Sequence, residues 1–527
     1  MRMKKTLALV LMVLLSISLL AGCGGDKGAS KEGSSTPKAG GKLVVALAQV
    51  PNTLDPVKYT GTYESNVMFA IFNTLVVYDQ TLSEIQPSLA TKWSVSSDMT
   101  EYTLELRDDV YFQKGKFQDG RKMTAEDVKY SLERSAKESA MKRLRMLKSV
   151  TVLDGNKIKI TIDKPNAAFL AVLTDRGNSI VCREEVEGWK EQFGQHPVGT
   201  GPFTFVSWAK DDNITLARNE RYFGGKPNLD ALVWRFIPNP NMMVNAVRTG
   251  EIDIATRITG PDRETIKKDS NLIMLSVPGM NVTFVGMNMQ NGPTANIKVR
   301  EAIAAATNAD EIVNAVFKWG GAVRSYGPVP AASWGYNPAV KDLVPKFELN
   351  KAKQLMKEAG YENGFKATIV TPQDDNRIKL ATIMQTQLKA INIDVEVKSM
   401  EWGSFSDTVA KGKADMYTLA WSWYPDPDFF LYQMFDSRQF GTLANGQGYK
   451  NDKVDALIRQ ATESAGGQEA RTKIYQDIQV LISKDVPRVE AWSLDEANVI
   501  KKRVHGYKVS ADGLIRIVTN GINVWVD

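Results

Sequence analysis

From about Pro227 onward, short apolar runs alternate with segments that have the length and periodicity of amphipathic helices. This alternation constrains the fold most, because strands that alternate with helices form an open sheet whose faces the helices cover. The strand-like runs lie at 232–237, 252–255, 367–370, 395–397 and 416–420, and the helix-like segments lie at 242–249, 297–317, 350–359 and 380–391. The sequence therefore predicts an α/β architecture for the second half of the chain.

The first 200 residues have a different pattern, in which local hairpins are frequent. Residues 149–163 predict two strands joined by Asp154-Gly155, a dipeptide typical of tight hairpin turns. Lys42–Leu47 has the composition of a buried strand. A helix is expected to begin at Thr124, because the Thr124 hydroxyl and the Asp127 carboxylate can form a capping box. Strands and helices are thus mixed throughout the chain.

The N-terminus has the features of an export signal. Residues 2–5 are mostly basic, and the apolar run at 7–20 is too short to span a bilayer as a helix. Leu20-Ala21-Gly22-Cys23 then resembles the bacterial lipobox, in which the chain is cut before the cysteine and lipid is attached to its thiol. An ordinary secretory signal with a chance cysteine is the alternative.

We therefore expect a lipoprotein signal peptide at residues 1–22 and a lipid anchor on Cys23. Residues 23–41 are rich in Gly, Ser and Lys, and they contain no large apolar residue, so they predict a flexible tether. The folded body would begin at about Lys42. It would work on the extracytoplasmic face of the cell membrane, in the periplasm or at the cell surface, held there only by the lipid.

Charge and composition exclude several classes of function. The net charge is +6, and Arg2, Lys4 and Lys5 lie in the expected signal peptide, so the mature chain would carry about +3. A charge this small and evenly spread argues against a nucleic-acid surface. The chain has only two Cys and two His, far too few for the ligand clusters of zinc or iron–sulfur centres. Neither a metal nor another cofactor is expected.

Catalytic motifs are also missing from the sequence. His196 and His505, the two available imidazole bases, lie next to a turn and a basic run, as surface histidines do. Gly199-Thr200-Gly201-Pro202 indicates a sharp bend rather than a phosphate loop, because Pro202 lacks an amide donor and no Lys follows in register. The inventory favours a binding protein over an enzyme, and a surface enzyme or adhesin has the least support.

Several segments, in order along the chain, are similar to the peptide- and nickel-type solute-binding proteins (family 5) of ABC transporters, which include dipeptide- and oligopeptide-binding lipoproteins. Individually the segments are weak signals, but their order and spacing extend over residues 42 to about 520. They are Leu54-Asp55-Pro56, residues 87–93 (PSLATKW), 102–134, 197–203 (PVGTGPF), 250–253 (GEID), 299–303 (VREAI) and 424–428 (YPDPD).

This resemblance implies a bilobal α/β fold, the type II fold of periplasmic binding proteins, with an extra subdomain inserted in lobe I. Lobe I would consist of residues 42–80, 205–285 and 503–527, the inserted subdomain of 81–204, and lobe II of 286–502. Hinge strands are expected near Gly286 and near residues 496–502. Closure about such hinges buries the ligand between the lobes.

The resemblance also implies where the ligand binds. Peptide-binding members hold the ligand's α-amino group with an Asp just before the segment that matches 424–428, and in this chain Trp423 occupies that position. Asp426 or Asp428 could substitute, although we expect Asp426 to cap the following helix. Trp421, Trp423 and Tyr424 offer flat faces for stacking, and Arg377 and Lys379 lie near the position of a carboxylate-binding residue. The predicted ligand-binding set is Trp421, Trp423, Tyr424, Arg377 and Asp426.

The predicted function is that of a receptor which captures a peptide-like ligand and delivers it to the permease and ATPase subunits of an ABC importer. Because the amine-anchoring Asp is replaced by Trp423, the alternative is an oligosaccharide or another non-peptide solute bound by the same scaffold. Neither reading involves nucleic acid, and both are compatible with a monomer.

Overall fold

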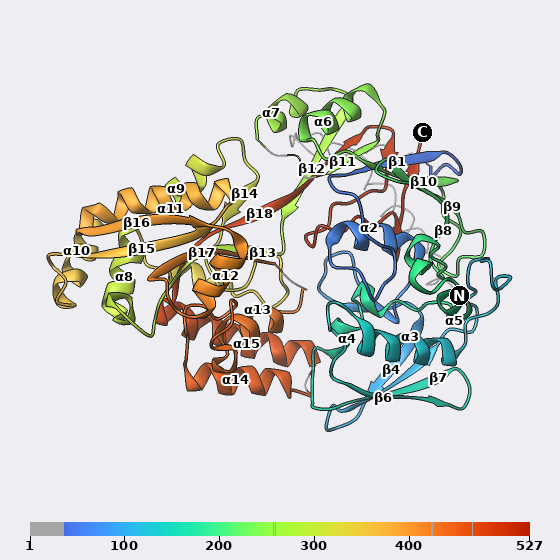
Figure 1. Cartoon of the computed structure of the whole chain (residues 1–527), viewed down its shortest axis with the longest axis horizontal. Helices are drawn as coiled ribbons and strands as arrows, with labels where there is room; N and C mark the ends of the chain where they lie inside the picture. The colour runs from blue at the N-terminus through green and yellow to red at the C-terminus, as the bar shows by residue number, and fades with distance from the viewer. Residues whose placement is uncertain (1–35, 257, 259, 423–424, 466) are drawn as a thin grey trace, which may run out of the picture. The chain divides into compact units, whose positions relative to one another are not determined.

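The longest strand, β18 (Arg488–Lys501), connects two halves of one large mixed sheet. Its first half pairs antiparallel with β13 (Asn281–Met287) and β14 (Ala322–Arg324). Its second half pairs antiparallel with β12 (Leu272–Pro278) and β11 (Ile254–Thr256). Figure 1 shows β18 in red between the two halves. The strand order is β16-β15-β17-β13-β18-β11-β1-β10-β9-β8, with β12 and β14 also paired to β18.

The computed structural model describes residues 36–256, 258, 260–422, 425–465 and 467–527, and the folded unit is Lys38–Asp527. We call the two sides of the sheet the β1 half and the β15 half. No helix among the described residues is both long and apolar enough to cross a membrane.

The β1 half contains the predicted strand β1 (Lys42–Leu47), which runs parallel to β10 (Ala231–Phe236). The β8–β9 hairpin extends the sheet beyond β10. Trp234 and the apolar side of β1 are fully buried against α2. The remaining elements of this half are β8 (Phe203–Ala209), β9 (Asn213–Arg218), α2 (Thr62–Ile71), α6 (Pro240–Thr249), α7 (Asp262–Lys267), β19 (Val504–His505), β20 (Val518–Thr519), β21 (Ile522–Asn523) and β22 (Trp525–Val526).

The β15 half contains the predicted strand–helix alternation. β15 (Phe365–Pro372) pairs parallel with β16 (Ile393–Met400) and with β17 (Met416–Ser422). The segment at 297–317 forms two helices rather than one, because Asn308 accepts a hydrogen bond from the Glu311 amide and starts a new helix. The helices of this half are α8 (Ile297–Ala306), α9 (Ala309–Val316), α10 (Leu349–Glu358), α11 (Asp375–Leu388), α12 (Trp402–Ala410), α13 (Asp428–Phe435), α14 (Asp452–Thr462) and α15 (Gly467–Asp485).

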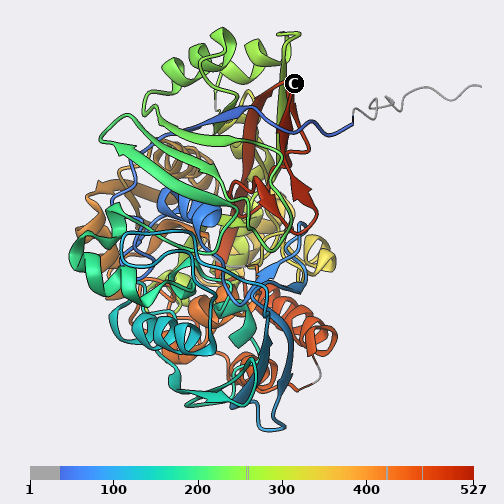
Figure 2. The same ribbon diagram turned by 90° about the vertical axis from the view of Figure 1, so that its right-hand side faces the viewer.

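A separate antiparallel sheet, in the order β4-β5-β7-β6, forms a four-stranded subdomain with α3 (Ala125–Glu138) packed on it (Figures 1 and 2). The capping box predicted at the start of α3 is present. The strands of this subdomain are β4 (Ala90–Val95), β5 (Glu101–Leu106), β6 (Leu147–Leu153) and β7 (Lys157–Ile162). The short elements that join it to the β1 half are β2 (Val76–Tyr78), β3 (Ile85–Pro87), α4 (Phe169–Val172) and α5 (Arg183–Trp189).

Two strands are placed differently from the lobe division expected from the sequence. β18 is shared by both halves, although the sequence assigned it to lobe II as far as residue 502. β13 pairs with β17 and with the first half of β18, so the chain passes between the halves at Gly279-Met280, before the predicted hinge at Gly286. The boundaries of the lobes as such stay a prediction.

Candidate ligand-binding cleft

The connection from β17 to α13 passes three cavities in succession. Residues 420–422 line a cavity of about 550 Å³, which we call the Trp421 cavity. Pro425 lines a second cavity of about 80 Å³, the Arg176 cavity. Asp426 lines a third cavity of about 740 Å³, the Trp334 cavity. The segment that the sequence singled out for ligand binding therefore borders open space along its described length.

The Trp421 cavity is built from both halves of the sheet. Trp421 is half-buried at the end of β17, and Lys379 approaches from α11. From the β1 half, Arg263 of α7 reaches the cavity and forms an ion pair of 3.3 Å with Asp495 of β18. A solute held here would touch both halves at once.

Arg377 does not line any of the three cavities, and its role in ligand binding stays a prediction. Asn376 and Lys379, which are three residues apart on α11, face the Trp421 cavity. Arg377 is about a quarter of a turn away from Asn376, and its Nε lies 3.5 Å from the Asp374 carboxylate. The cation that α11 contributes to this cavity is therefore Lys379.

The Arg176 cavity places two guanidinium groups over one aromatic ring. The guanidinium carbons of Arg176 and Arg516 lie 4.2 Å and 5.1 Å from the centroid of Phe69. Arg516 is neutralised by Asp512, to which it donates two hydrogen bonds of 2.8 Å and 2.6 Å. Both arginines are nearly fully buried.

Arg176 differs from Arg516, because no carboxylate among the described residues lies within ion-pair distance of it. Its Nη2 donates to the Thr74 hydroxyl at 3.1 Å and to the Thr174 carbonyl at 3.0 Å. Burial, together with the nearby charge of Arg516, lowers the pKa of Arg176 to about 10. A buried cation without a counter-ion is costly, so this position is suited to an anionic group of a ligand.

The neighbouring carboxylate in this cavity is already engaged. Asp175 accepts a hydrogen bond of 2.7 Å from the Tyr59 hydroxyl and lies 3.6 Å from the Nε of Arg143. Burial raises the pKa of Asp175. The Asp175 carboxylate is therefore shared with Tyr59 and Arg143, and it forms no ion pair with Arg176.

Asp426 is not available as an amine anchor. Its carboxylate accepts hydrogen bonds of 2.7 Å and 2.8 Å from Arg471, and both side chains are buried. It also accepts from the Asp428 amide at 3.0 Å, which is the helix-start contact expected from the sequence. A ligand ammonium would have to compete with a buried guanidinium for this carboxylate. Trp423 and Tyr424, like Cys23, lie outside the described residues.

The Trp334 cavity lies between the four-stranded subdomain and the α14–α15 connection. Its apolar wall includes Tyr78, Tyr102 and Trp334, and its inner end is the Asp426–Arg471 pair. The subdomain and the helices also touch directly, because the Ala167 amide donates to the Thr462 carbonyl at 2.8 Å. Tyr78 lines this cavity and the Arg176 cavity, so the two are adjacent.

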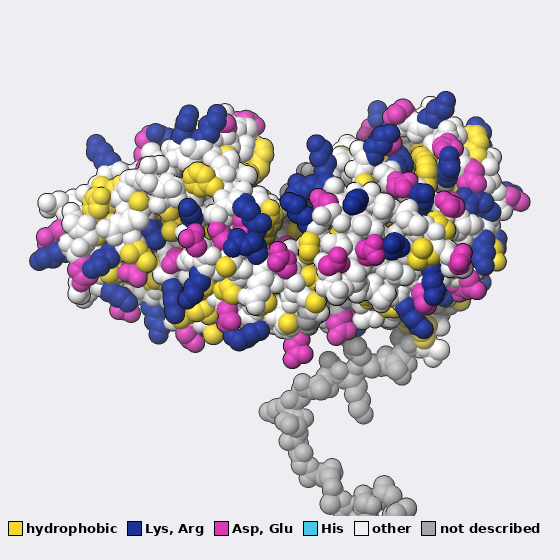
Figure 3. Space-filling model, turned by 90° about the horizontal axis from the view of Figure 1, so that it is seen from below, with side chains coloured by type: hydrophobic (Ala, Val, Ile, Leu, Met, Phe, Trp, Pro, Cys, Tyr) yellow, Lys and Arg dark blue, Asp and Glu magenta, His cyan; other side chains and the backbone are white. Residues whose placement is uncertain are grey.

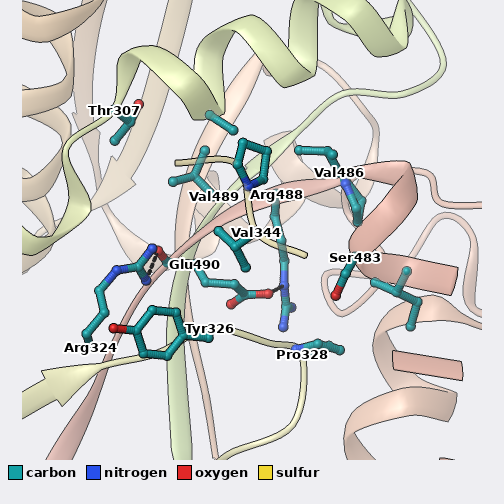
Figure 4. Close-up of a pocket in the computed structure, with 14 residues that line it drawn as sticks. Thr307, Arg324, Tyr326, Pro328, Val344, Ser483, Val486, Arg488, Val489 and Glu490 are labelled. Carbon is teal, nitrogen blue, oxygen red and sulfur yellow. Dashed lines mark hydrogen bonds and ion pairs between the residues drawn. The ribbon is translucent and has the colours of Figure 1, made fainter. Parts of the chain in front are cut away.

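A fourth cavity, behind the first half of β18, is too small for a solute (Figure 4). It measures about 40 Å³, which is space for one or two waters. Arg488 and Glu490 lie beside it and share a hydrogen bond of 2.6 Å. Burial raises the pKa of Glu490. This cavity belongs to the interior of the β15 half.

The two histidines lie apart from all of these cavities. His196 stacks on Trp189 with ring centroids 3.7 Å apart, and His505 stacks on Trp525 at 4.0 Å. Across the described ranges, no group of three or more His, Cys, Asp or Glu side chains is arranged to hold a metal ion. Figure 3 shows basic and acidic side chains interspersed over one face of the molecule.

Comparison with known proteins assigns the chain to a family. The family model for bacterial extracellular solute-binding proteins, family 5, matches residues 84–442, which is more than half of the chain. The chain therefore belongs to this family, whose members are extracytoplasmic receptors of ABC importers for peptides and related ligands. The fold class expected from the sequence, that of type II periplasmic binding proteins, is confirmed.

Three relatives cover nearly the whole chain. Heme-binding protein A of Haemophilus influenzae is 29% identical over 97% of this chain and 98% of its own length. The structure of HbpA2 from Haemophilus parasuis superposes with a TM-score of 0.86 at 28% identity, covering 92% of this chain and all of that one. The binding protein DppA from Helicobacter pylori, in complex with the peptide STSA, has a TM-score of 0.73 at 32% identity, covering 93% and 99%.

Sequence reasoning missed Arg176 and Trp334. Arg176 is the first residue of a three-residue 3-10 helix, and its importance depends on Phe69 and Arg516, which are distant in sequence. A lone arginine in so short an element has no pattern that distinguishes it from a surface charge. Trp334 lies in an irregular segment between β14 and α10, where periodicity gives no information.

Proposed function

We propose that this protein is a lipid-anchored receptor that captures a peptide-like ligand with a free carboxylate between its two lobes and delivers it to an ABC importer. The observation that carries the proposal is Arg176, a buried cation in the cleft without a carboxylate partner among the described residues. Charge-assisted bonds from a guanidinium to a carboxylate are strong and directional. A neutral ligand would leave this cation uncompensated.

An oligosaccharide is the second candidate, and the aromatic side chains favour it. Trp421 and Trp334 each line a cavity with an indole ring, and such rings stack well on sugar faces. The sequence adds Trp423 and Tyr424 to this set. Arg176 favours the peptide-like ligand, because a neutral sugar would bury the guanidinium without a counter-ion.

Mass spectrometry of the ligand released from denatured protein distinguishes the two. We expect a compound with at least one carboxyl group and amide bonds. Calorimetry on the ligand-free protein should then show that C-terminal amidation of a binding peptide weakens it about tenfold or more. A released neutral sugar, together with no binding by short peptides, would contradict the proposal.

The membrane anchor rests on the lipobox-like Leu20-Ala21-Gly22-Cys23 and on the tether behind it. The double acylation of a lipoprotein would give stable attachment where one chain is marginal. We expect the Cys23→Ser variant to be recovered in the periplasm or medium instead of the membrane fraction. Retention of that variant in the membrane, with no lipid mass on the wild-type protein, would mean that the anchor is absent.

A further inference from the structure

We propose that the Trp334 cavity is a second subsite, which binds the positively charged end or side chain of a peptide longer than a dipeptide. This inference rests on the proposed function and adds the class of ligand. The cavity of about 740 Å³ lies within the range of cavities that hold whole small ligands. It is therefore large enough to hold the end or a side chain of a peptide.

The charge of the cavity is opposite to that of the Arg176 cavity. Glu84 and Glu469 line it and are exposed, and neither forms an ion pair with any described residue. Asp426 and Arg471 compensate each other at the inner end, and no lysine lines the cavity. Its lining thus carries two uncompensated negative charges, which favour a cation.

The aromatic wall suits the same kind of group. Tyr78, Tyr102 and Trp334 line the cavity, and aromatic faces attract ammonium and guanidinium groups. The Tyr102 hydroxyl is bonded to the Asn166 carbonyl, so its ring is fixed in place. The Tyr78 hydroxyl has no hydrogen-bond partner in the described part of the chain and can accept from a ligand N–H.

The position of the cavity implies an extended ligand. Tyr78 separates it from the Arg176 cavity, where we place a carboxylate. A zwitterionic peptide could then lie across the opposite charges of the two cavities. Each extended residue adds about 3.3–3.6 Å of length, so added residues would carry a basic group beyond Tyr78.

Calorimetry at low ionic strength tests the subsite with tetraalanine that carries Lys or Glu at its first or fourth position. At one of these two positions, the peptide that carries Lys should bind about tenfold tighter than the peptide that carries Glu. In the Glu84→Gln, Glu469→Gln double variant the ratio should fall below about threefold. The control is Glu463→Gln, an exposed change outside the cavity that should keep the ratio. An unchanged ratio in the double variant would overturn the inference while leaving the proposed function intact.

A second probe does not depend on peptide binding. Phenethylammonium joins an apolar ring to a cation, and it should shift the ¹⁹F resonance of Trp334 in protein labelled with 5-fluorotryptophan, assigned with Trp334→Phe. The double variant should need about fivefold more of the probe for the same shift. If the tetrapeptides fail to bind and this shift remains, the subsite stands and the peptide function fails. Absence of the shift, or an equal shift in the double variant, would overturn the subsite.

Discussion

At the residue scale, one buried cation determines what the cleft should prefer. Arg176 keeps its place through two neutral acceptors, Thr74 and Thr174, instead of a carboxylate. The neutral acceptors fix the orientation of the guanidinium and leave its charge for a ligand. Phe69 supports the planar group from one side.

We expect Arg176→Gln to weaken a carboxylate-bearing peptide by at least 30-fold, because truncating one side of a buried charge pair costs about 2–5 kcal/mol. The amidated peptide, which has already lost the pair, should be affected much less by the same variant. Calorimetric titration of the acid and the amide into the wild type and into Arg176→Gln completes a double-mutant cycle. The surface variant Arg183→Gln is the matched control. Equal losses for acid and amide would show that Arg176 does not meet the carboxylate.

Asp428 allows a prediction on pH. Burial raises the pKa of its carboxyl to about 6, and the neighbouring Asp426 adds to the effect. Since the pKa in the unfolded chain is lower, the folded state holds the proton more tightly, and its stability from this group falls as pH rises from about 4 to 6. The ionised Asp428 carboxylate therefore lowers the stability of the folded state at neutral pH.

The Asp428→Asn variant removes this titration and can still accept a bond from Thr462. Relative to the wild type, it should gain about 2 kcal/mol in unfolding free energy between pH 4.5 and pH 7.5. Urea unfolding of both proteins at the two pH values measures the difference in unfolding free energy between variant and wild type. The titrations of all other groups cancel in this difference. A difference that does not change with pH would place the carboxyl in contact with water.

At the element scale, the bend at residues 199–202 is explained by close packing. Gln113 bonds through its amide to the Ile71, Gly201 and Phe203 carbonyls, which holds the bend against the end of α2. A Cβ at Gly201 would lie only 2.5 Å from the Ile71 backbone. The glycine is needed for this approach between two backbones.

Gly201→Ala should therefore lower the free energy of unfolding by about 1–3 kcal/mol, the usual cost of overpacking. Thermal unfolding followed by circular dichroism would report this loss. Gly61→Ala is the comparison, because its added Cβ meets the end of a side chain, the Glu64 carboxylate, and no backbone atom. If both variants unfold at the wild-type temperature, the backbone at residue 201 has more room than the structure gives it.

The sequence predicted elements well where the pattern is local. The capping box at Thr124 and the strand at 42–47 depend on neighbours in the chain, and both are present. The break between α8 and α9 was missed, because the apolar periodicity continues across Asn308. The sequence could not show that Asn376 and Lys379 are the α11 residues that line the Trp421 cavity, because tertiary packing determines which side of a helix faces a cavity.

At the scale of the whole molecule, the two halves of the sheet are joined by β18 and by the chain passage between β12 and β13. They also meet at the β2–β3 hairpin, where the Gln468 side chain donates to the Ser83 carbonyl at 2.6 Å. These contacts lie at the two ends of the series of cavities. A ligand held between them would stabilise the arrangement by touching both halves.

We expect the radius of gyration to fall when ligand is added back to protein stripped of it, because a ligand that contacts both halves selects the closed arrangement. Small-angle scattering with the co-purified ligand measures the change, and mass spectrometry of the mixture checks that the ligand is returned unaltered. A constant radius at saturation, or a converted product, would count against a receptor that works by closure.

The position of β18 near the end of the chain has a consequence for biogenesis. Neither half of the large sheet has its central strand until residues 488–501 have been synthesised and exported. Until then β13 and β11 each present an unpaired edge, the kind of surface that invites aggregation. The large sheet therefore cannot be completed before β18 is available, whereas the four-stranded subdomain takes no strand from β18 and can form its own sheet earlier.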